Sequence, residues 1–122
     1  MSKQLKMGVK VQNANENTLQ NTLKRMKNDV GLQIINCKDF PIWNGKMVKV
    51  QGTCIKLPDV SRCVDVYVKD GQLVLNGDEM DLDYVRQKLV MFYGATYAES
   101  QLTNVQSEYN KKADEIDMYV SY

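Results

Sequence analysis

The chain has 122 residues, 43% apolar and 25% charged, a composition typical of one folded domain. It contains no histidine, which excludes His-dependent catalytic triads, Cys-His pairs and zinc sites that need a histidine ligand. No apolar run approaches the roughly 20 residues of a membrane helix. Because the first twelve residues also lack a signal-peptide core, we expect a single domain over residues 1–122 in the cytoplasm.

Charge is unevenly distributed along the chain, although the net charge is only +1. Residues 1–57 contain ten Lys/Arg and three Asp/Glu, a net charge of +7, whereas residues 58–122 contain six and twelve, a net charge of −6. This asymmetry favours a basic binding face or head-to-tail self-association. The alternative is that both halves fold into one sheet in which the charges interleave.

The first two predicted elements are a strand and a helix. Apolar and polar residues alternate over residues 5–12, which predicts a strand with one polar face. Residues 15–31 are predicted to form a helix, because Asn15 is a good N-cap residue and Gly31 suits the position after the last turn. The apolar stripe of this helix consists of Leu19, Leu23, Met26 and Val30.

The middle of the chain is predicted to be rich in strands. Residues 32–37 form a short strand, and residues 38–46 form a loop, because Pro41 interrupts strand pairing and an Asn-Gly pair favours a turn. Residues 46–57 are predicted to form a long strand that bends or bulges at Gly52.

The second half contains the clearest element, a hairpin over residues 63–77. Two strand-forming runs flank Asp70–Gly71, a pair typical of a two-residue type I′ turn. A long helix is predicted over residues 81–105, with Asp81 as its N-cap. Alternation over residues 116–122 predicts a final strand.

The predicted element order is therefore β-α-β-β-β-β-α-β. Helices that interrupt a sheet built mostly of hairpins favour an α+β fold. We expect a two-layer sandwich, with a mainly antiparallel sheet of about six strands and two helices. The first strand, helix and second strand should form a βαβ unit with a right-handed crossover.

Several segments resemble the hypothetical chloroplast open reading frame thirty-five family, also called domain of unknown function twelve-fifty-seven. They are a helix with paired leucines and a closing glycine, the hairpin "VDVYVKDGQLVLNGDEMD", and the stretch "YVRQKLVMFYGATYAES", with the matching residues Leu19, Leu23, Gly31, Lys88, Leu89 and Tyr93. The family occurs in cyanobacteria, plastids, other bacteria and phages. The resemblance implies a compact α+β domain without an established activity, and it extends our expectation to a phage-encoded host-interaction or anti-defence factor.

Few residues suggest catalysis or metal binding. Four acids follow the predicted hairpin, but they lack the spacing of a calcium-binding loop, so we interpret them as an exposed junction with capping acids: Asp78, Glu79, Asp81 and Asp83. The cysteines show no metal-binding or disulfide pattern and are interpreted as small buried apolar residues: Cys37, Cys54 and Cys63. We expect a non-enzymatic protein without catalytic residues, metal or cofactor.

Aromatic residues suggest binding instead. Phe40 and Trp43 lie in the predicted loop, where they could anchor a protein interface, although Trp43 could equally cap the core. Tyr67 and Tyr119 could share the open face of the sheet as a platform for stacking bases, or they could belong to a protein interface.

The stretch "MFYGATYAES" at residues 91–100 raises a third alternative, a nucleotide site. Such a site would combine aromatic stacking with cationic contacts to phosphate, from Arg86, Lys88, Tyr93 and Tyr97, with Arg62 further away. Gly94 weakens a helix interior, which suggests that something packs closely against it. Our leading prediction is binding to another protein or to itself as a homo-oligomer, and the alternative is binding of a nucleotide or single-stranded nucleic acid.

Overall fold

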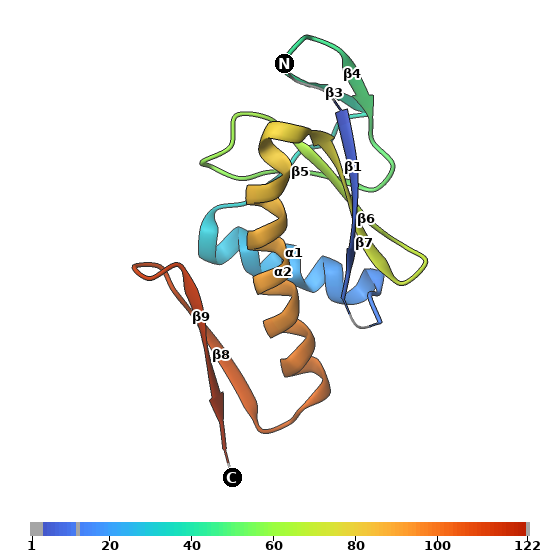
Figure 1. Cartoon of the computed structure of the whole chain (residues 1–122). Helices are drawn as coiled ribbons and strands as arrows, with labels where there is room; N and C mark the ends of the chain where they lie inside the picture. The colour runs from blue at the N-terminus through green and yellow to red at the C-terminus, as the bar shows by residue number, and fades with distance from the viewer. Residues whose placement is uncertain (1–3, 12, 122) are drawn as a thin grey trace.

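The computed structural model describes residues 4–11 and 13–121, which form an α+β fold (Figure 1). Its two helices are α1 (Glu16–Val30) and α2 (Glu79–Gln101). The strands are β1 (Gln4–Lys10), β2 (Gln33–Ile34), β3 (Asp39–Pro41), β4 (Met47–Lys49), β5 (Thr53–Lys56), β6 (Val64–Lys69), β7 (Gln72–Asp78), β8 (Val105–Asn110) and β9 (Glu115–Val120). Gln12 and Tyr122, which we predicted to lie in strands, are outside the described residues.

The main sheet has five antiparallel strands in the order β1-β7-β6-β5-β2. We expected about six strands in one sheet, but β3–β4 and β8–β9 instead form two separate two-stranded sheets. The strands before and after α1 lie at opposite edges of the main sheet, so they are not the neighbouring pair of a simple βαβ unit. The mainly antiparallel α+β class with two helices is confirmed.

Helix α1 begins and ends where the sequence predicts. The Asn15 side chain accepts a hydrogen bond from the backbone N–H of Thr18, with 2.8 Å between Oδ1 and N. Gly31 adopts the left-handed conformation with a φ of 73°, which only glycine takes up readily. Leu19, Leu23 and Met26 are completely buried, so the predicted apolar stripe faces the core.

The main core lies between the two helices and one face of the main sheet. Its sheet side is formed by the inward-facing residues of β5, β6 and β7, which include Ile55, Val64, Val66, Leu73 and Leu75. Helix α2 crosses α1 in Figure 1 and contributes Leu82, Val85, Leu89 and Phe92 to the same core. Phe92 is therefore a core residue, as its helical register predicts.

The predicted loop and long strand over residues 38–57 have a different structure. They contain the β3–β4 hairpin, a break over residues 50–52, and then β5. The break arises because the backbone N–H groups of Gln51 and Gly52 donate to the carboxylate of Asp65, on β6, instead of joining a strand ladder. Gly52 also lies so close to Tyr67 and to the β6 backbone that a side chain would collide with them. The bend predicted at Gly52 is confirmed.

The C-terminal part differs from the prediction at both ends of α2. The helix is capped by Asp78 rather than Asp81, because the Asp78 side chain accepts the backbone N–H of Met80. It ends at Gln101, since Leu102 has extended backbone angles, and Val105 begins a strand that we placed inside the helix. An apolar residue at this position fits a helical and a strand pattern equally well, so periodicity alone did not separate them.

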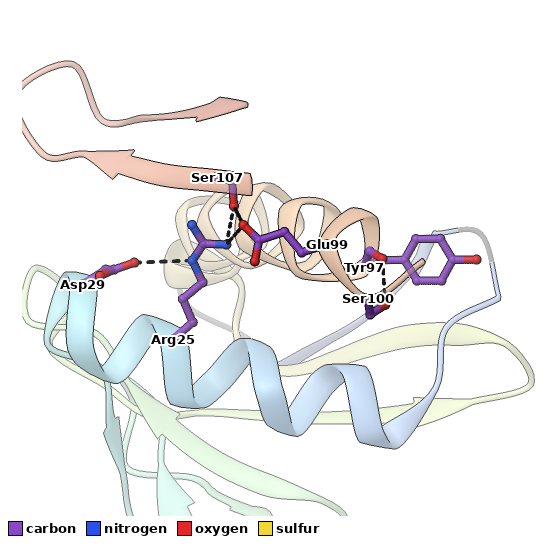
Figure 2. A network of polar contacts seen from close by, with 6 residues as sticks. All are labelled: Arg25, Asp29, Tyr97, Glu99, Ser100 and Ser107. Carbon is purple, nitrogen blue, oxygen red and sulfur yellow. Dashed lines mark hydrogen bonds and ion pairs between the residues drawn. The ribbon is translucent and has the colours of Figure 1, made fainter. Parts of the chain in front are cut away.

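Polar contacts attach the β8–β9 hairpin to the helices (Figure 2), in addition to the packing of Tyr109 and Ile116 against the core. Arg25, on α1, donates from Nη1 to the Ser107 hydroxyl at 2.7 Å and lies 3.6 Å from the Glu99 carboxylate of α2. The same guanidinium is paired with Asp29, with 3.4 Å between Nε and Oδ2. A single arginine thus joins α1, α2 and β8. A two-stranded hairpin is marginally stable alone, so these contacts hold it in place.

Candidate protein-binding site

The β3–β4 hairpin presents one tryptophan at its turn. The backbone N–H of Gly45 donates to the Ile42 carbonyl at 2.9 Å, and Gly45 has a φ of 82°, so the chain reverses sharply there. Ile42 is buried beneath the turn, whereas Trp43 is 70% exposed. Of the two interpretations that the sequence left open, the structure therefore excludes Trp43 as a cap of the core.

A buried carboxylate fixes the backbone on which Trp43 sits. Asp78, at the end of β7, is 0% exposed. Its Oδ2 accepts the backbone N–H of Trp43 at 2.8 Å, and its Oδ1 accepts the backbone N–H of Met80 at 3.0 Å. Met80 is itself 66% exposed. One carboxylate thus positions two large apolar side chains that both face solvent.

Arg62 completes this arrangement. Its guanidinium carbon lies 5.2 Å from the centre of the Trp43 ring, a distance at which a cation and an aromatic face attract each other. Its Nε lies 3.5 Å from Asp78 Oδ2 and 3.7 Å from Asp81 Oδ2. The arginine therefore joins buried Asp78 and partly buried Asp81 to the exposed ring. We call Trp43, Arg62 and Met80 the Trp43 face.

The pKa values of the two acids beneath the Trp43 face are shifted in opposite directions overall. Burial raises the pKa of Asp78, but hydrogen bonds from the backbone of Trp43 and Met80, together with Arg62, outweigh it and lower the pKa overall. Burial raises the pKa of Asp81, and the nearby Arg62 compensates only in part. Asp78 is a capping acid as expected, since it caps α2, but the expected exposure is wrong, because Asp78 is buried and also accepts the backbone N–H of Trp43.

The other predicted interface residues do not join the Trp43 face. Phe40 is 3% exposed and packs with Ile42 and Val48 in a second apolar cluster, so it supports the hairpin from within. Tyr67 lies on β6 of the main sheet and Tyr119 on β9 of a separate sheet, so the two rings do not form a common platform.

The tyrosines of "MFYGATYAES" are also separated by their surroundings. Tyr93 is 1% exposed, and its hydroxyl accepts the backbone N–H of Asn15 at 3.0 Å. Tyr97 is half-buried and points away from the Arg25 network in Figure 2. Apart from its two chain neighbours and the backbone of its own helix, no described atom lies within 4 Å of a Cβ built on Gly94, so our expectation of close packing there is wrong. Gly94 instead lines an open apolar hollow of about 260 Å³ with Val11, Val90, Tyr93 and Tyr97.

The cationic residues proposed for a nucleotide site lie elsewhere. Arg86 is paired with Asp83 at 2.9 Å. Lys88 is ion-paired with Asp114 at the end of the β8–β9 hairpin and lies between the rings of Tyr84 and Tyr109, 5.6 and 5.9 Å from their centres. Neither cation is among the residues that line the hollow at Gly94.

Lys88 belongs to a polar cluster that the sequence did not reveal. The Tyr109 hydroxyl donates to Asp114 at 2.7 Å, and burial together with this carboxylate raises the pKa of Tyr109 to about 12. The Tyr84 hydroxyl donates to Asp59 at 3.0 Å. Asp59, Tyr84, Lys88 and Tyr109 line a cleft of about 240 Å³ between α1, α2 and the hairpin. Lys88, on α2, is ion-paired with Asp114, in the turn of the hairpin. The cluster therefore attaches the hairpin to α2.

The three cysteines, which have no recognisable spacing in the sequence, lie together in the structure. Cys54 is buried, as predicted, and within hydrogen-bonding reach of half-buried Cys37 and Cys63. Burial, followed by these two neighbours, raises the pKa of the Cys54 thiol well above its usual range. In the described part of the chain, no group of acidic or cysteine side chains is arranged to hold a metal ion.

Comparison with protein-family models, with curated proteins and with solved structures found no match to this chain. The resemblance to the hypothetical chloroplast open reading frame thirty-five family thus stays a prediction. Neither helix of the described residues is long and apolar enough to cross a membrane.

Proposed function

We propose that this protein is a non-enzymatic binding protein that recognises another protein through the Trp43 face. The observation that carries the proposal is the fixed backbone of two exposed side chains, Trp43 and Met80, on the carboxylate of Asp78. Tryptophan, methionine and arginine are enriched in protein interfaces, and tryptophan and arginine often dominate the binding energy. A side chain that is already positioned loses less conformational freedom on binding.

The non-enzymatic part of the proposal is supported by how the buried acids are used. Both oxygens of Asp78 accept backbone N–H groups, which gives this carboxylate a structural role. The chain has no histidine to act as a general base. We propose that the protein acts in the cytoplasm, and its family resemblance supports a bacterial or phage origin with a host-interaction or anti-defence role.

The test compares the purified protein with matched variants in native mass spectrometry and in capture experiments with a bacterial lysate. We expect Trp43→Ala and Met80→Ala to abolish binding to self or to captured proteins. Ile34→Ala is the control, because Ile34 is also large, apolar and 52% exposed but lies on edge strand β2. Urea unfolding establishes that each variant is folded. Equal binding by Trp43→Ala and the wild type would exclude the Trp43 face.

The alternative, binding of a nucleotide or single-stranded nucleic acid, is tested in the same samples. The candidate residues Arg86, Lys88 and Tyr93 lie in different environments, so this alternative has less support. A nucleotide or oligonucleotide that copurifies, seen as a bound mass and as raised absorbance at 260 nm, would favour it. Turnover of a nucleotide by the purified protein would overturn both binding proposals.

A further inference from the structure

We propose that the Trp43 face binds a second copy of this chain, at the outer face of its β8–β9 hairpin, so that copies associate head to tail. This inference rests on the proposed function and identifies the partner. The outer face of the hairpin is formed by the side chains that point away from α2. We call Glu108, Glu115, Asp117 and Tyr119 the acidic hairpin face.

The register of the hairpin places like charges side by side. Glu108 is directly opposite Asp117, and Tyr119 is opposite Gln106 on the same face. Like charges at directly opposed positions destabilise an antiparallel pair. A partner that brings positive charge to this face would relieve the repulsion, whereas the isolated chain retains it.

These acids have no ion-pair partner among the residues that the structure describes. None of the ion pairs among residues 4–11 and 13–121 includes Glu108, Glu115 or Asp117. The two lysines of the hairpin turn, Lys111 and Lys112, also form no ion pair with them. The inner side of the hairpin differs, because there Asp114 is paired with Lys88 and Ser107 bonds to Arg25. Within the β8–β9 hairpin, the acids without an ion pair thus all lie on the side that faces away from α2.

The hairpin that bears Trp43 has an excess of positive charge, although Glu79 and Asp81 flank Met80 in the sequence. The β3–β4 hairpin and the residue before it contain three exposed lysines, Lys38, Lys46 and Lys49, and one acid, Asp39, which is opposite Lys49. No ion pair of the described chain includes any of these three lysines. Trp43 at 70% and Tyr119 at 54% exposure provide one exposed aromatic ring on each surface. The excess of lysines on the β3–β4 hairpin therefore complements the acids of the acidic hairpin face, and each surface carries an exposed aromatic ring.

The position of the two surfaces determines the kind of assembly. In Figure 1 the β3–β4 hairpin and the β8–β9 hairpin lie at opposite ends of the molecule. A copy that uses its Trp43 face thus keeps its acidic hairpin face free, and the reverse also holds. Contacts between two different surfaces of identical chains generate rings or open filaments rather than closed two-fold dimers. The split of charge between the two halves of the sequence is consistent with this arrangement.

The experiment uses two full-length variants, each with one surface altered. The head variant is Trp43→Ala, and the tail variant combines Glu108→Gln with Asp117→Asn. Replacing the two opposed acids by amides removes their repulsion, so the tail variant should fold at least as well as the wild type. Trp43 is the only tryptophan in the chain, so the head variant has none. In a mixture of the two variants, tryptophan fluorescence therefore comes only from the tail variant and reports on its intact Trp43 face.

Sedimentation velocity and native mass spectrometry across micromolar concentrations measure the assembly. We expect the wild type to form larger species with increasing concentration and to lose them with added salt. The self-association of each variant alone should weaken by about 30-fold or more. An equimolar mixture should form a dimer of one head variant and one tail variant that grows no further, with a blue shift of the Trp43 emission.

Two results would overturn the inference. The first is a wild type that stays monomeric, and the second is a tail variant that associates as the wild type does. If Trp43→Ala nevertheless abolishes binding to another protein, the proposed function stands and only the identity of the partner is wrong. If Trp43→Ala changes neither self-association nor capture of another protein, the proposed function fails as well.

Discussion

Asp78 accepts the backbone N–H of Trp43 across 35 positions of sequence, with 2.8 Å between Oδ2 and the amide nitrogen. The carboxylate belongs to the end of β7, and the amide belongs to the turn between β3 and β4. Neither strand of that hairpin is part of the main sheet. This hydrogen bond therefore links the turn that bears Trp43 to the start of α2, and it fixes the backbone from which the exposed indole projects.

We predict that Asp78→Ala destabilises the protein by about 3 kcal/mol or more, because it leaves the N–H groups of Trp43 and Met80 and the charge of Arg62 without their buried partner. Asp78→Asn retains one acceptor oxygen and should cost less. Urea unfolding measures both. Asp83→Ala is the control: it removes only exposed contacts, with Arg86 and Gln87, and should cost less than about 1 kcal/mol. Equal losses for Asp78→Ala and Asp83→Ala would contradict the anchoring role.

The two glycines at positions 94 and 52 should respond to alanine in opposite directions. Gly94→Ala should stabilise the protein by up to about 1 kcal/mol, since it improves helix propensity and its Cβ would meet no atom within 4 Å. Gly52→Ala should destabilise it, because the new methyl group would collide with Tyr67 and with the backbone of Val66. Thermal or urea unfolding of both variants checks this pair. A stabilising Gly52→Ala would show that the break after β4 can shift to make room.

Tyr109 should make stability fall at alkaline pH. Its pKa is raised from 10.0 to about 12 in the folded state, so the folded protein retains this proton more strongly than the unfolded chain. The contribution of the Tyr109 proton to the free energy of unfolding is therefore fully present below about pH 10 and is lost as pH rises towards 12. We expect Tyr109→Phe to flatten the decline in unfolding free energy over this window. An unchanged slope would mean that Tyr109 titrates normally in the folded protein.

Local sequence signals predicted the parts of the fold that depend on neighbouring residues. Asn15 and Gly31 bound α1 as expected, and the Asp70–Gly71 turn has φ values of 53° and 73°, as a type I′ turn requires. The break between β4 and β5 depends instead on Asp65, which captures two distant backbone N–H groups. Such contacts leave no periodic pattern, so the sequence suggested a bend at Gly52 without its cause.

In the candidate site too, the sequence predicted what depends on neighbouring residues and did not predict contacts between distant ones. Trp43 was recognisable as an exposed anchor from its residue type and its turn, but its exposure was one of two equal alternatives. Asp78 looked like one of four capping acids, because nothing local distinguishes an acid that reaches a hairpin 35 positions away. Cys37, Cys54 and Cys63 converge for the same reason: the chain folds back on itself, and their spacing carries no signal.

The attachment of the β8–β9 hairpin should weaken in acid. Hydrogen bonds from Lys88 and Tyr109 lower the pKa of Asp114 below 3.8, so the folded protein keeps this carboxylate ionised more readily than the unfolded chain. The resulting stability is present above pH 3.8 and is lost as pH falls through the lower value in the folded state. The pKa of Asp78 is lowered as well, so both carboxylates contribute to the loss of stability in acid. A variant at Asp114 separates its contribution from that of Asp78. We expect Asp114→Asn to be less stable than the wild type near neutral pH and to show a shallower loss in acid, measured by urea unfolding between about pH 5 and pH 2.

The control is Asp83→Asn, which should keep the wild-type slope, since its exposed pair with Arg86 lies away from the hairpin. If Asp114→Asn instead matches the wild type in both stability and slope, the ion pair with Lys88 does not hold the hairpin, and the aromatic contact between Phe92 and Tyr109 must do so.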